Sequence, residues 1–272
     1  MSNVFGRNKS LKFRTTAHRE KRNRRKLIIL FSIVFTIIFV ASLVTFINER
    51  SKPIESDDEE SEITYVADNL KEEVSILFVG ASTNENTPLF ASVITLNTKT
   101  KVFTIVCFDP NLGVDASKGD KLVAAVETKY NTEIDRYCIV TQEQFKPFIT
   151  AMGKYNVNIK ETINYSDSEY TLSLLPGQQT LNCDNFFKYI RYMATSGTDS
   201  AYKAQAGVIG DYISQKLNET NSAKGQDLYE SLVNNSSSDI KPDDYLRYQT
   251  LLDEISAEPR NIETAGTKFL EK

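Results

Sequence analysis

The stretch VSILFVG, residues 74–80, decides the fold of this chain. Five of its first six side chains are apolar, and the run closes at Gly80. A short continuous apolar run that ends at a glycine is typical of a β-strand buried on both of its faces. The stretch therefore predicts a sheet that is covered on both sides.

Further β-rich runs follow along the chain. Phe90–Leu96 and Lys101–Phe108 flank the polar turn Asn97–Thr100, so we expect these two runs to pair as a hairpin. Tyr137–Val140 is a further short strand. Helices are expected at Leu122–Tyr130, Asp184–Met193, Tyr202–Leu217, Asp227–Val233 and Pro242–Ser256. Strands mixed with helices predict an α/β fold, an α/β/α layered domain with a central mixed sheet.

The clearest helix is predicted just after residue 141. Its apolar face is formed by residues spaced i, i+3, i+4 and i+7, which are Phe145, Phe148, Ile149 and Met152. Gly153 follows as a stop signal. Thr141 and Gln144 have the spacing of a capping box, but a cap at Thr141 would place Pro147 beyond the first turn, where proline disrupts the hydrogen-bond ladder. We therefore expect the helix to begin nearer Gln144.

A membrane span is predicted near the N-terminus. Leu27–Ile47 is a run of 21 residues without charge, Pro or Gly. A helix of this length reaches about 31 Å, enough to cross the hydrocarbon core of a bilayer. A cleaved signal peptide is the alternative, but it has a shorter apolar region and a small-x-small cleavage site, which residues 44–48 lack. We predict an uncleaved transmembrane signal anchor.

Basic residues are concentrated ahead of this run. Residues 1–26 hold ten of the 32 Lys and Arg and one of the 36 Asp and Glu. Basic clusters beside a span are retained in the cytoplasm, so we expect a single-pass protein of the plasma membrane with its N-terminus inside and its folded domain outside. The remainder of the chain is acidic and shows no DNA-binding motif, so no nucleic-acid partner is expected.

The chain divides into five predicted parts. Residues 48–70 form a linker, because Ser56–Glu62 is too charged and too poor in apolar residues to pack. The parts are a basic cytoplasmic tail (1–26), the anchor (27–47), the acidic linker (48–70), the extracytoplasmic domain (71–257) and a C-terminal tail (258–272).

Cysteine and histidine limit the possible chemistry. Cys107, Cys138 and Cys183 are an odd set without a Cys-x-x-Cys pair, so at least one thiol is unpaired and their redox state stays open. The one histidine, His18, lies in the basic tail, which excludes a Ser-His-Asp or Cys-His arrangement from the folded domain. The scarcity of both residue types also argues against zinc.

Several stretches in a fixed order carry a resemblance to a known family. They begin with residues 74–80, VITLNTKT (93–100) and IDRYCIV (134–140). The most specific is LPGQQTLN (175–182), which runs into FKYIRY (187–192). The chain resembles the LytR-CpsA-Psr (LCP) family of bacterial cell-envelope proteins, which has a similar Leu-x-x-Gly-x-Gln-x-Leu-Asn run leading into Tyr-x-Arg. The resemblance covers most of the region from Val74 to about Ile255 and includes the anchor topology.

The resemblance implies a function outside the membrane. Members of the family are transferases that move a glycan phosphate from a polyprenyl-pyrophosphate carrier onto peptidoglycan, usually with magnesium. In such a site arginines clamp the pyrophosphate and acids hold the metal. The lipid tail is expected in an apolar cleft between sheet and helices.

The charged motifs of the family are incomplete in this chain. The first motif, Arg-Ser-Asp-Thr, falls on Thr87–Phe90, where Leu89 replaces the Asp. The second, Ile-Pro-Arg-Asp, falls on Phe108–Asn111 and lacks its Arg, with Asp109 one residue away from the acidic position. Because the side chain of Leu89 cannot bind a cation, we expect no cofactor here.

The third and fourth motifs are also depleted. The Arg-x-Arg motif keeps Arg191 but has Met193 at its second position. In the motif Asp-x-x-Arg-x-x-Arg-Gln, Asp199 can match, whereas the arginine positions hold Tyr202 and Gln205. The resemblance leaves three candidate ligand-binding residues, Arg191, Asp199 and Lys203, and no catalytic or metal-binding residue.

These candidates have plainer alternatives. Arg191 could hold a lipid phosphate or pair with a local acid, and Asp199 could cap a helix instead of binding a ligand. The tyrosines of this region, Tyr189, Tyr192 and Tyr202, could line a glycan surface or simply pack on amphipathic helices.

The lost arginines decide the interpretation. Each charged hydrogen bond contributes about 1.5–3 kcal/mol, and lysine does not reproduce the bidentate fork of arginine. We interpret the chain as a non-catalytic, membrane-anchored cell-envelope protein (a pseudoenzyme) that binds a polyprenyl-linked glycan or an envelope partner. Two alternatives stay open: an active phosphotransferase that attaches glycopolymers to peptidoglycan with charges from Lys188, Arg191 and Lys203, and a ligand-free structural interaction module.

Overall fold

Six strands form the central sheet, in the order β10-β3-β2-β1-β4-β9. The computed structural model of the protein describes residues 70–84, 86–258 and 261–270. Strand β1 (Glu73–Ala81) contains the stretch 74–80 and pairs antiparallel with β2 (Pro88–Asn97) and parallel with β4 (Arg136–Thr141). β2 and β3 (Val102–Phe108) form the predicted antiparallel hairpin. The sheet is therefore mixed, as the sequence predicts.

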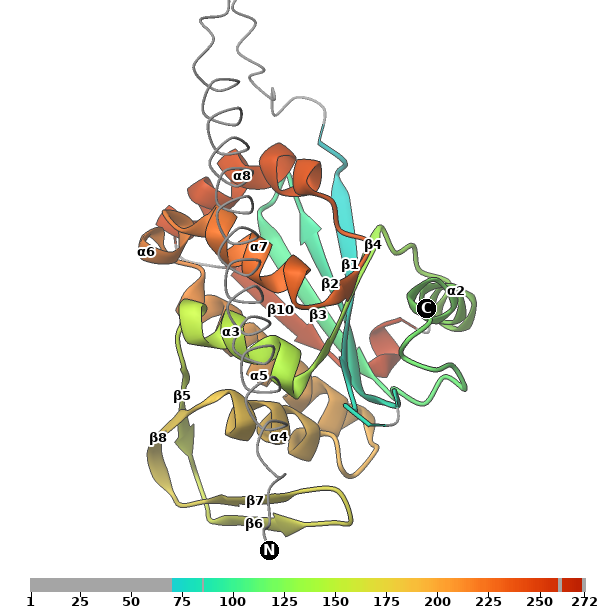
Figure 1. Cartoon of the computed structure of the whole chain (residues 1–272), viewed down its shortest axis with the longest axis vertical. Helices are drawn as coiled ribbons and strands as arrows, with labels where there is room; N and C mark the ends of the chain where they lie inside the picture. The colour runs from blue at the N-terminus through green and yellow to red at the C-terminus, as the bar shows by residue number, and fades with distance from the viewer. Residues whose placement is uncertain (1–69, 85, 259–260, 271–272) are drawn as a thin grey trace, which may run out of the picture. The chain divides into compact units, whose positions relative to one another are not determined.

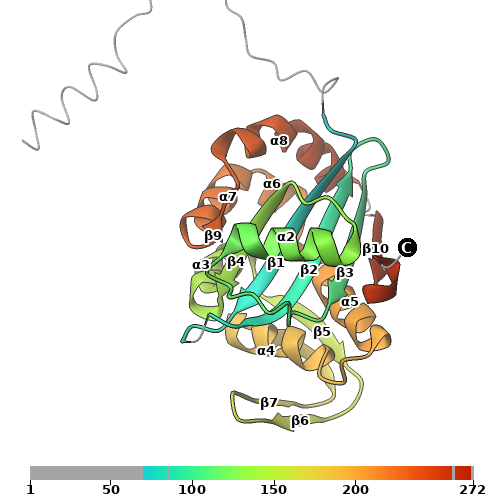
Figure 2. The ribbon, with the colours of Figure 1, turned by 90° about the vertical axis from the view of Figure 1, so that its right-hand side faces the viewer.

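Both faces of β1 are covered. Leu77 and Val79 pack into a cluster with α2 (Gly119–Tyr130), which covers one face of the sheet (Figure 1, Figure 2). Ile76 and Phe78 pack into the larger cluster on the opposite face, where α3, α4 and α5 lie. This two-sided burial confirms the layered α/β architecture.

The remaining elements follow the predicted order of helices. The bounds are α3 Gln142–Met152, β5 Tyr155–Ile159, β6 Ile163–Ser166, β7 Thr171–Leu174, β8 Gly177–Leu181, α4 Cys183–Met193, α5 Asp199–Lys216, α6 Glu219–Ser222, α7 Gly225–Asn234, β9 Ser237–Ser238, α8 Pro242–Ala257, β10 Asn261–Ala265 and the 3₁₀ turn η2 Thr267–Phe269. Each helix expected from the sequence is present, with ends that differ by a few residues.

The start of α3 differs from the expectation. The Thr141 hydroxyl accepts a hydrogen bond from the Gln144 backbone N–H at 3.3 Å, and the Gln144 side chain accepts one from the Thr141 N–H at 2.9 Å. This complete capping box starts the helix at Gln142, so the prediction of a start nearer Gln144 is wrong. Pro147 lies inside the helix at an exposed position, where it removes one ladder bond and its ring meets solvent.

Four short strands between α3 and α4 were not predicted. β5 pairs with β8 and β6 pairs with β7, each as a two-stranded antiparallel sheet at one end of the domain (Figure 1). Buried side chains alternate with exposed ones along these strands. In β7, Leu172 and Leu174 are buried, whereas Thr171 and Ser173 are exposed. The hairpin of β6 and β7 supplies part of the cavity described below.

The C-terminal segment adds a strand to the sheet. β10 pairs in parallel with β3, although the sequence places residues 258–272 in a tail. Ile262 of β10 approaches α5 so closely that a Cβ at Gly210 would lie 2.9 Å from its side chain. The folded domain thus extends beyond residue 257, and glycine at position 210 allows α5 to pack on this edge.

The predicted anchor Leu27–Ile47 lies outside the described residues, as do the basic tail and residues 48–69 of the linker. No helix within the described ranges is both long enough and apolar enough to cross a membrane. All three cysteines are described, and each is a buried free thiol. Burial raises the pKa of the Cys138 and Cys183 thiols to about 11.

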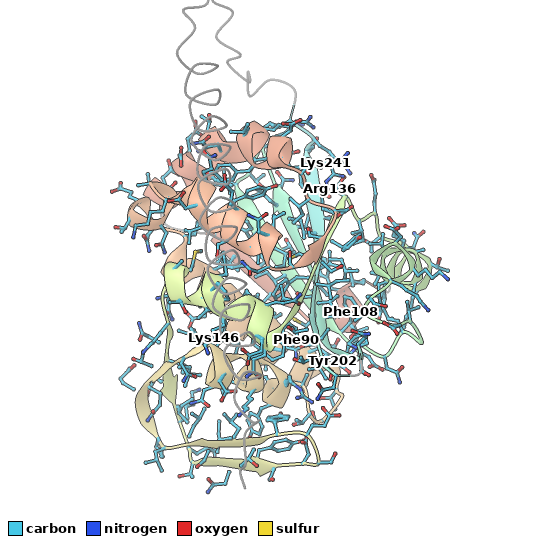
Figure 3. All side chains as sticks on the ribbon, viewed as in Figure 1. Phe90, Phe108, Arg136, Lys146, Tyr202 and Lys241 are labelled. Atoms are coloured by element: carbon cyan, nitrogen blue, oxygen red, sulfur yellow. The ribbon has the colours of Figure 1, made fainter. Side chains whose placement is uncertain are left out.

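One partly buried ion pair joins the sheet to α8. Arg136 of β4 donates two hydrogen bonds to Asp244 in the first turn of α8, at 2.7 and 2.9 Å. The Lys241 N–H donates to the same carboxylate at 2.8 Å. Figure 3 labels Arg136 and Lys241 at this end of the domain. Burial alone would raise the pKa of Asp244, but the hydrogen bonds from Arg136 and the Lys241 N–H, together with the nearby guanidinium charges, hold this pKa below the ordinary 3.8.

We expect the substitution Asp244→Asn to lower the free energy of unfolding at pH 7 by about 1–3 kcal/mol. Since the pKa of Asp244 is lowered by folding, its contribution is present above pH 3.8 and is lost as the pH falls through the lower folded-state pKa. Urea denaturation of both proteins at pH 7 and at the lowest pH where they fold should show the difference shrinking. Lys99→Ala, which removes an exposed pair with Glu72, is the control and should change stability less. Equal stabilities at pH 7 would contradict the prediction.

Candidate ligand-binding cavity

Positions from all four charged motifs meet in one cavity of about 420 Å³, which we call the motif cavity. Its lining comes from β2, the segment after β3, the β6–β7 hairpin, the end of α4 with the loop that follows, and α5. The residues are Leu89, Asp109, Pro110, Tyr165, Asp167, Tyr170, Arg191, Ala194, Thr195, Gly197, Tyr202 and Gln205. Distant motifs thus converge as the resemblance implies.

The sheet register explains this convergence. Ala91 and Phe108 form the last residue pair between β2 and β3. Leu89 and Asp109 therefore both lie just beyond this pair, at the open end of the hairpin. Tyr202, labelled in Figure 3, lies toward this end of the sheet. Gln205 of α5 donates a hydrogen bond through Nε2 to the Ile190 carbonyl of α4 at 2.9 Å, which holds the two helices together behind the cavity.

Arg191 lines the motif cavity and already has a counter-ion. Its Nη2 donates to the Glu169 carboxylate, which comes from the β6–β7 turn rather than from the helix of Arg191. Its guanidinium lies 4.3 Å from the centre of the Tyr170 ring, and its side chain is 16% exposed. Glu169 therefore neutralises the positive charge of Arg191 that a ligand phosphate would otherwise meet. The Tyr170 ring covers one face of the guanidinium.

Asp167 orders the turn that presents Glu169 and Tyr170. Its carboxylate accepts the backbone N–H groups of Glu169 and Tyr170, at 2.7 and 2.8 Å, and the Tyr165 hydroxyl at 3.1 Å. Burial by itself would raise the pKa of Asp167, but these donors outweigh it and lower the pKa below its ordinary value. Asp167 is thus a structural anion at neutral pH. Sequence reasoning missed this turn, although an Asp ahead of Ser-Glu-Tyr between alternating runs is a recognisable turn signal.

Two of the three candidate residues do not line the motif cavity. Asp199 accepts a hydrogen bond from the Lys268 N–H at 2.9 Å, and a Cβ at Gly266 would lie 2.3 Å from the Asp199 carbonyl. Asp199 therefore tethers the C-terminal segment to α5. Lys203 is exposed on α5. The structure brings Arg191 alone of the three candidates into the cavity.

The charge of the cavity does not suit pyrophosphate, and its side chains do not provide a complete magnesium site. Asp109 and Asp167 are opposed by Arg191 alone, so the charged lining is net negative. The metal-acid position is Leu89, whose hydrocarbon side chain offers no ligand. No group of three or more His, Cys, Asp or Glu side chains in residues 70–84, 86–258 and 261–270 could hold a metal ion. The residues present do not fit the magnesium that the family uses.

Aromatic rings fill the layer between the sheet and the helices. Phe90 of β2 packs edge-on against Phe187 of α4 at 5.0 Å, and Phe78 of β1 contacts Phe145 of α3 at 5.6 Å. A Cβ at Gly80 would lie 2.1 Å from the Phe90 ring, so this ring lies directly on the β1 backbone. Since protein interiors are close-packed, a prenyl chain placed in this layer would have to displace these rings.

The sequence profile of the LytR_cpsA_psr family matches residues 114–267 of this chain. This chain belongs to that family. The match covers more than half of the sequence and includes the segments around Arg191 and Gln205. The LCP resemblance inferred from short motifs is therefore confirmed.

Solved structures show the same fold at low sequence identity. A protein of Eubacterium siraeum, described as a candidate transcription regulator, superposes with a TM-score of 0.61 at 16% identity over 78% of this chain and 89% of its own. TagV of B. subtilis gives 0.53 at 19% identity, over 71% and 84% of the two chains. A transcriptional regulator of Enterococcus faecalis gives 0.56 at 17% identity, over 72% and 76%. No curated protein matches the sequence.

We expect Glu169→Gln to increase the affinity of the cavity for inorganic pyrophosphate by up to about five-fold, because it removes the counter-ion of Arg191. Calorimetric titration of pyrophosphate into both proteins measures this. Glu161→Gln is the matched control, since Glu161 is exposed, precedes the same hairpin and has no partner among the described residues. An unchanged affinity in Glu169→Gln would show that the ion pair does not limit anion binding.

Proposed function

We propose that this protein is a membrane-anchored, non-catalytic LCP protein of the cell envelope that binds a glycan in the motif cavity. A polyprenyl-linked glycan is the expected ligand. The observation that carries the proposal is the convergence of Leu89, Tyr202 and Gln205 on the cavity, at positions where the family has an acid and two arginines. The framework for holding a ligand is kept, while the groups that would perform phosphoryl transfer are replaced.

The chemistry of transfer explains why replacement matters. A transferring phosphoryl group is stabilised by cations and donors that face its oxygens. Tyr202 and Gln205 carry no charge, and the remaining Arg191 is paired with Glu169. A pyrophosphate would therefore enter a net negative cavity without an unpaired arginine to receive it.

The active-transferase alternative requires cations from other positions. Lys188 pairs with Asp184 at 2.9 Å, four residues earlier on α4, and does not line the cavity. Lys203 is exposed and does not line it either. These placements favour the non-catalytic proposal over an active phosphotransferase.

We expect the full-length protein, supplied in detergent with a labelled polyprenyl-pyrophosphate glycan, peptidoglycan and magnesium, to transfer no glycan phosphate, and Arg191→Ala to behave alike. Gel separation of labelled peptidoglycan from labelled lipid measures transfer, with an active LCP transferase as the positive control. Turnover that Arg191→Ala abolishes would establish the active alternative instead. Saturable binding of the lipid-linked glycan at micromolar concentration, measured in the same preparation, supports the proposal, whereas its absence favours the ligand-free module.

The proposal also places the domain outside the plasma membrane on an uncleaved anchor, Leu27–Ile47. We expect protease added to intact spheroplasts to remove a C-terminal tag, while an N-terminal tag stays protected on a short membrane-bound fragment. Immunoblots of the two tags measure this, with spheroplasts lysed before digestion as the control. A mature protein that begins after residue 47 and is recovered from the medium would show a cleaved signal peptide instead.

A further inference from the structure

A groove between α7 and α8, which we call the helical groove, lies apart from the motif cavity. Its volume is about 270 Å³, and its lining consists of Gln226, Tyr229, Glu230, Val233, Asn234, Tyr245 and Leu246. α8 lies at the end of the domain opposite to the β6–β7 hairpin (Figure 1, Figure 2). The two sites share no lining residue, so the helical groove is separate from the proposed glycan site.

Two stacked tyrosines fix the shape of the helical groove. The rings of Tyr229 on α7 and Tyr245 on α8 lie 5.2 Å apart, with 29° between their planes. A Cβ at Gly225 would lie 2.1 Å from the Tyr245 hydroxyl, so this hydroxyl lies directly on the α7 backbone. The ion pair between Asp244 and Arg136 also ties α8 to the sheet. The lining is therefore held in place before a partner binds, which lowers the entropic cost of binding.

Leu246 continues the apolar lining to the protein surface. It is 41% exposed, whereas Leu251 of the same helix is buried. A single exposed leucine is ordinary for a soluble domain. Here, however, Leu246 lines the same groove as Val233 and the stacked tyrosines. The apolar surface is thus gathered in one place and has the concave shape that receives a side chain of a partner.

Acidic side chains surround this apolar lining. Glu230 lines the groove and accepts a hydrogen bond from Gln226 at 3.1 Å. Asp227 lies about one turn before Glu230 on α7, and Asp243 lies about one turn before Leu246 on α8, so each acid is on the same side of its helix as a lining residue. All three acids are exposed, and none forms an ion pair with another described residue.

This negative charge decides which occupant fits the groove. Arg136 is committed to Asp244, and neither Lys241 nor Arg247 lines the groove, so the charge is not neutralised from within the lining. The chain's own linker carries five acids in Ser56–Glu62 and would be repelled. A second copy docked about a two-fold axis would bring the same acids together. A basic partner is attracted, because complementary charge steers association.

We propose that the helical groove docks a basic segment of a partner protein. One aromatic or large aliphatic side chain of this segment inserts beside Leu246, while flanking lysines or arginines meet Asp227, Glu230 and Asp243. The volume of about 270 Å³ is below the range of about 300–1,000 Å³ that is common for small-molecule sites, which matches one inserted side chain. This inference goes beyond the proposed function and does not rest on it.

The test titrates the full-length protein in an uncharged detergent with three capped pentapeptides: Lys-Lys-Phe-Lys-Lys, Lys-Lys-Ala-Lys-Lys and Gln-Gln-Phe-Gln-Gln. By calorimetry, we expect the first to bind about ten-fold more tightly than the second, because only the phenylalanine can fill the groove. It should bind about five-fold more tightly than the third, because the lysines meet the acids. Equal affinity of the first peptide and either of the others, or no saturable binding at millimolar concentration, overturns the inference.

Variants locate the binding in the groove. Leu246→Gln should weaken the affinity for the basic phenylalanine peptide by about five-fold, because it removes apolar contact at an exposed position. Leu175→Gln is the matched control, since Leu175 is 65% exposed and lies outside the groove. The triple variant Asp227→Asn, Glu230→Gln, Asp243→Asn should bind the basic and the neutral phenylalanine peptides alike. Unchanged affinity in Leu246→Gln, or an unchanged preference for the basic peptide in the triple variant, overturns the inference.

The oligomeric state distinguishes a second copy from a basic partner. We expect sedimentation in the same detergent to give one mass for the wild-type protein and for Leu246→Gln. Self-association that Leu246→Gln abolishes would assign the groove to a second copy and overturn the inference. Failure of these tests leaves the proposed glycan site untouched, because the two sites share no lining residue. Transfer of glycan phosphate to peptidoglycan would refute the proposed function without bearing on the groove.

Discussion

Burial of β1 on both faces is the constraint on which the domain depends. Leu77 and Val79 face α2, and Phe78 faces α3, so helices must cover both sides of the sheet. The pairing of β1 with β2, and of β2 with β3, then places Leu89 and Asp109 at one end of the sheet. There they line the cavity together with residues of α4 and α5. The motif cavity therefore follows from apolar packing and strand register. Its charged residues take no part in this packing, so the fold does not depend on them.

The local patterns of the sequence predicted the elements with dense apolar side chains and missed those without. Phe90–Leu96 and the helix around Phe145 have clear periodicity, and both are present. β10 has the sequence NIETA and is mostly polar, so its place beside β3 depends on Ile262 meeting α5 rather than on a local signal. The start of α3 was misplaced because the capping box at Thr141 was recognised but given less weight than the helix-breaking effect of Pro147, and the structure forms this cap in full.

The cavity was predictable where a motif could be aligned and not where a contact is tertiary. Arg191, Tyr202 and Gln205 were identified from their positions in the motifs, and they meet as the resemblance implies. Glu169 lies 22 residues from Arg191 in sequence, and nothing in either segment announces their pairing. Asp199 also aligned with the family, yet its carboxylate is committed to the backbone of Lys268, 69 residues away. A matched residue type therefore does not establish a matched role, because its partners come from parts of the chain that the motif does not contain.

Electrostatics explains how Arg191 is accommodated in the cavity. A guanidinium that is mostly withdrawn from solvent is costly unless an opposite charge compensates it, and in an anion-binding site the ligand does so. Here Glu169 compensates Arg191 from within the chain, while Tyr202 and Gln205 are neutral and need no counter-ion. The positive charge of Arg191 is therefore balanced without an anionic ligand. The excess charge that remains in the cavity, from Asp109 and Asp167, is negative. A bound phosphate would add to this negative excess instead of compensating a positive charge.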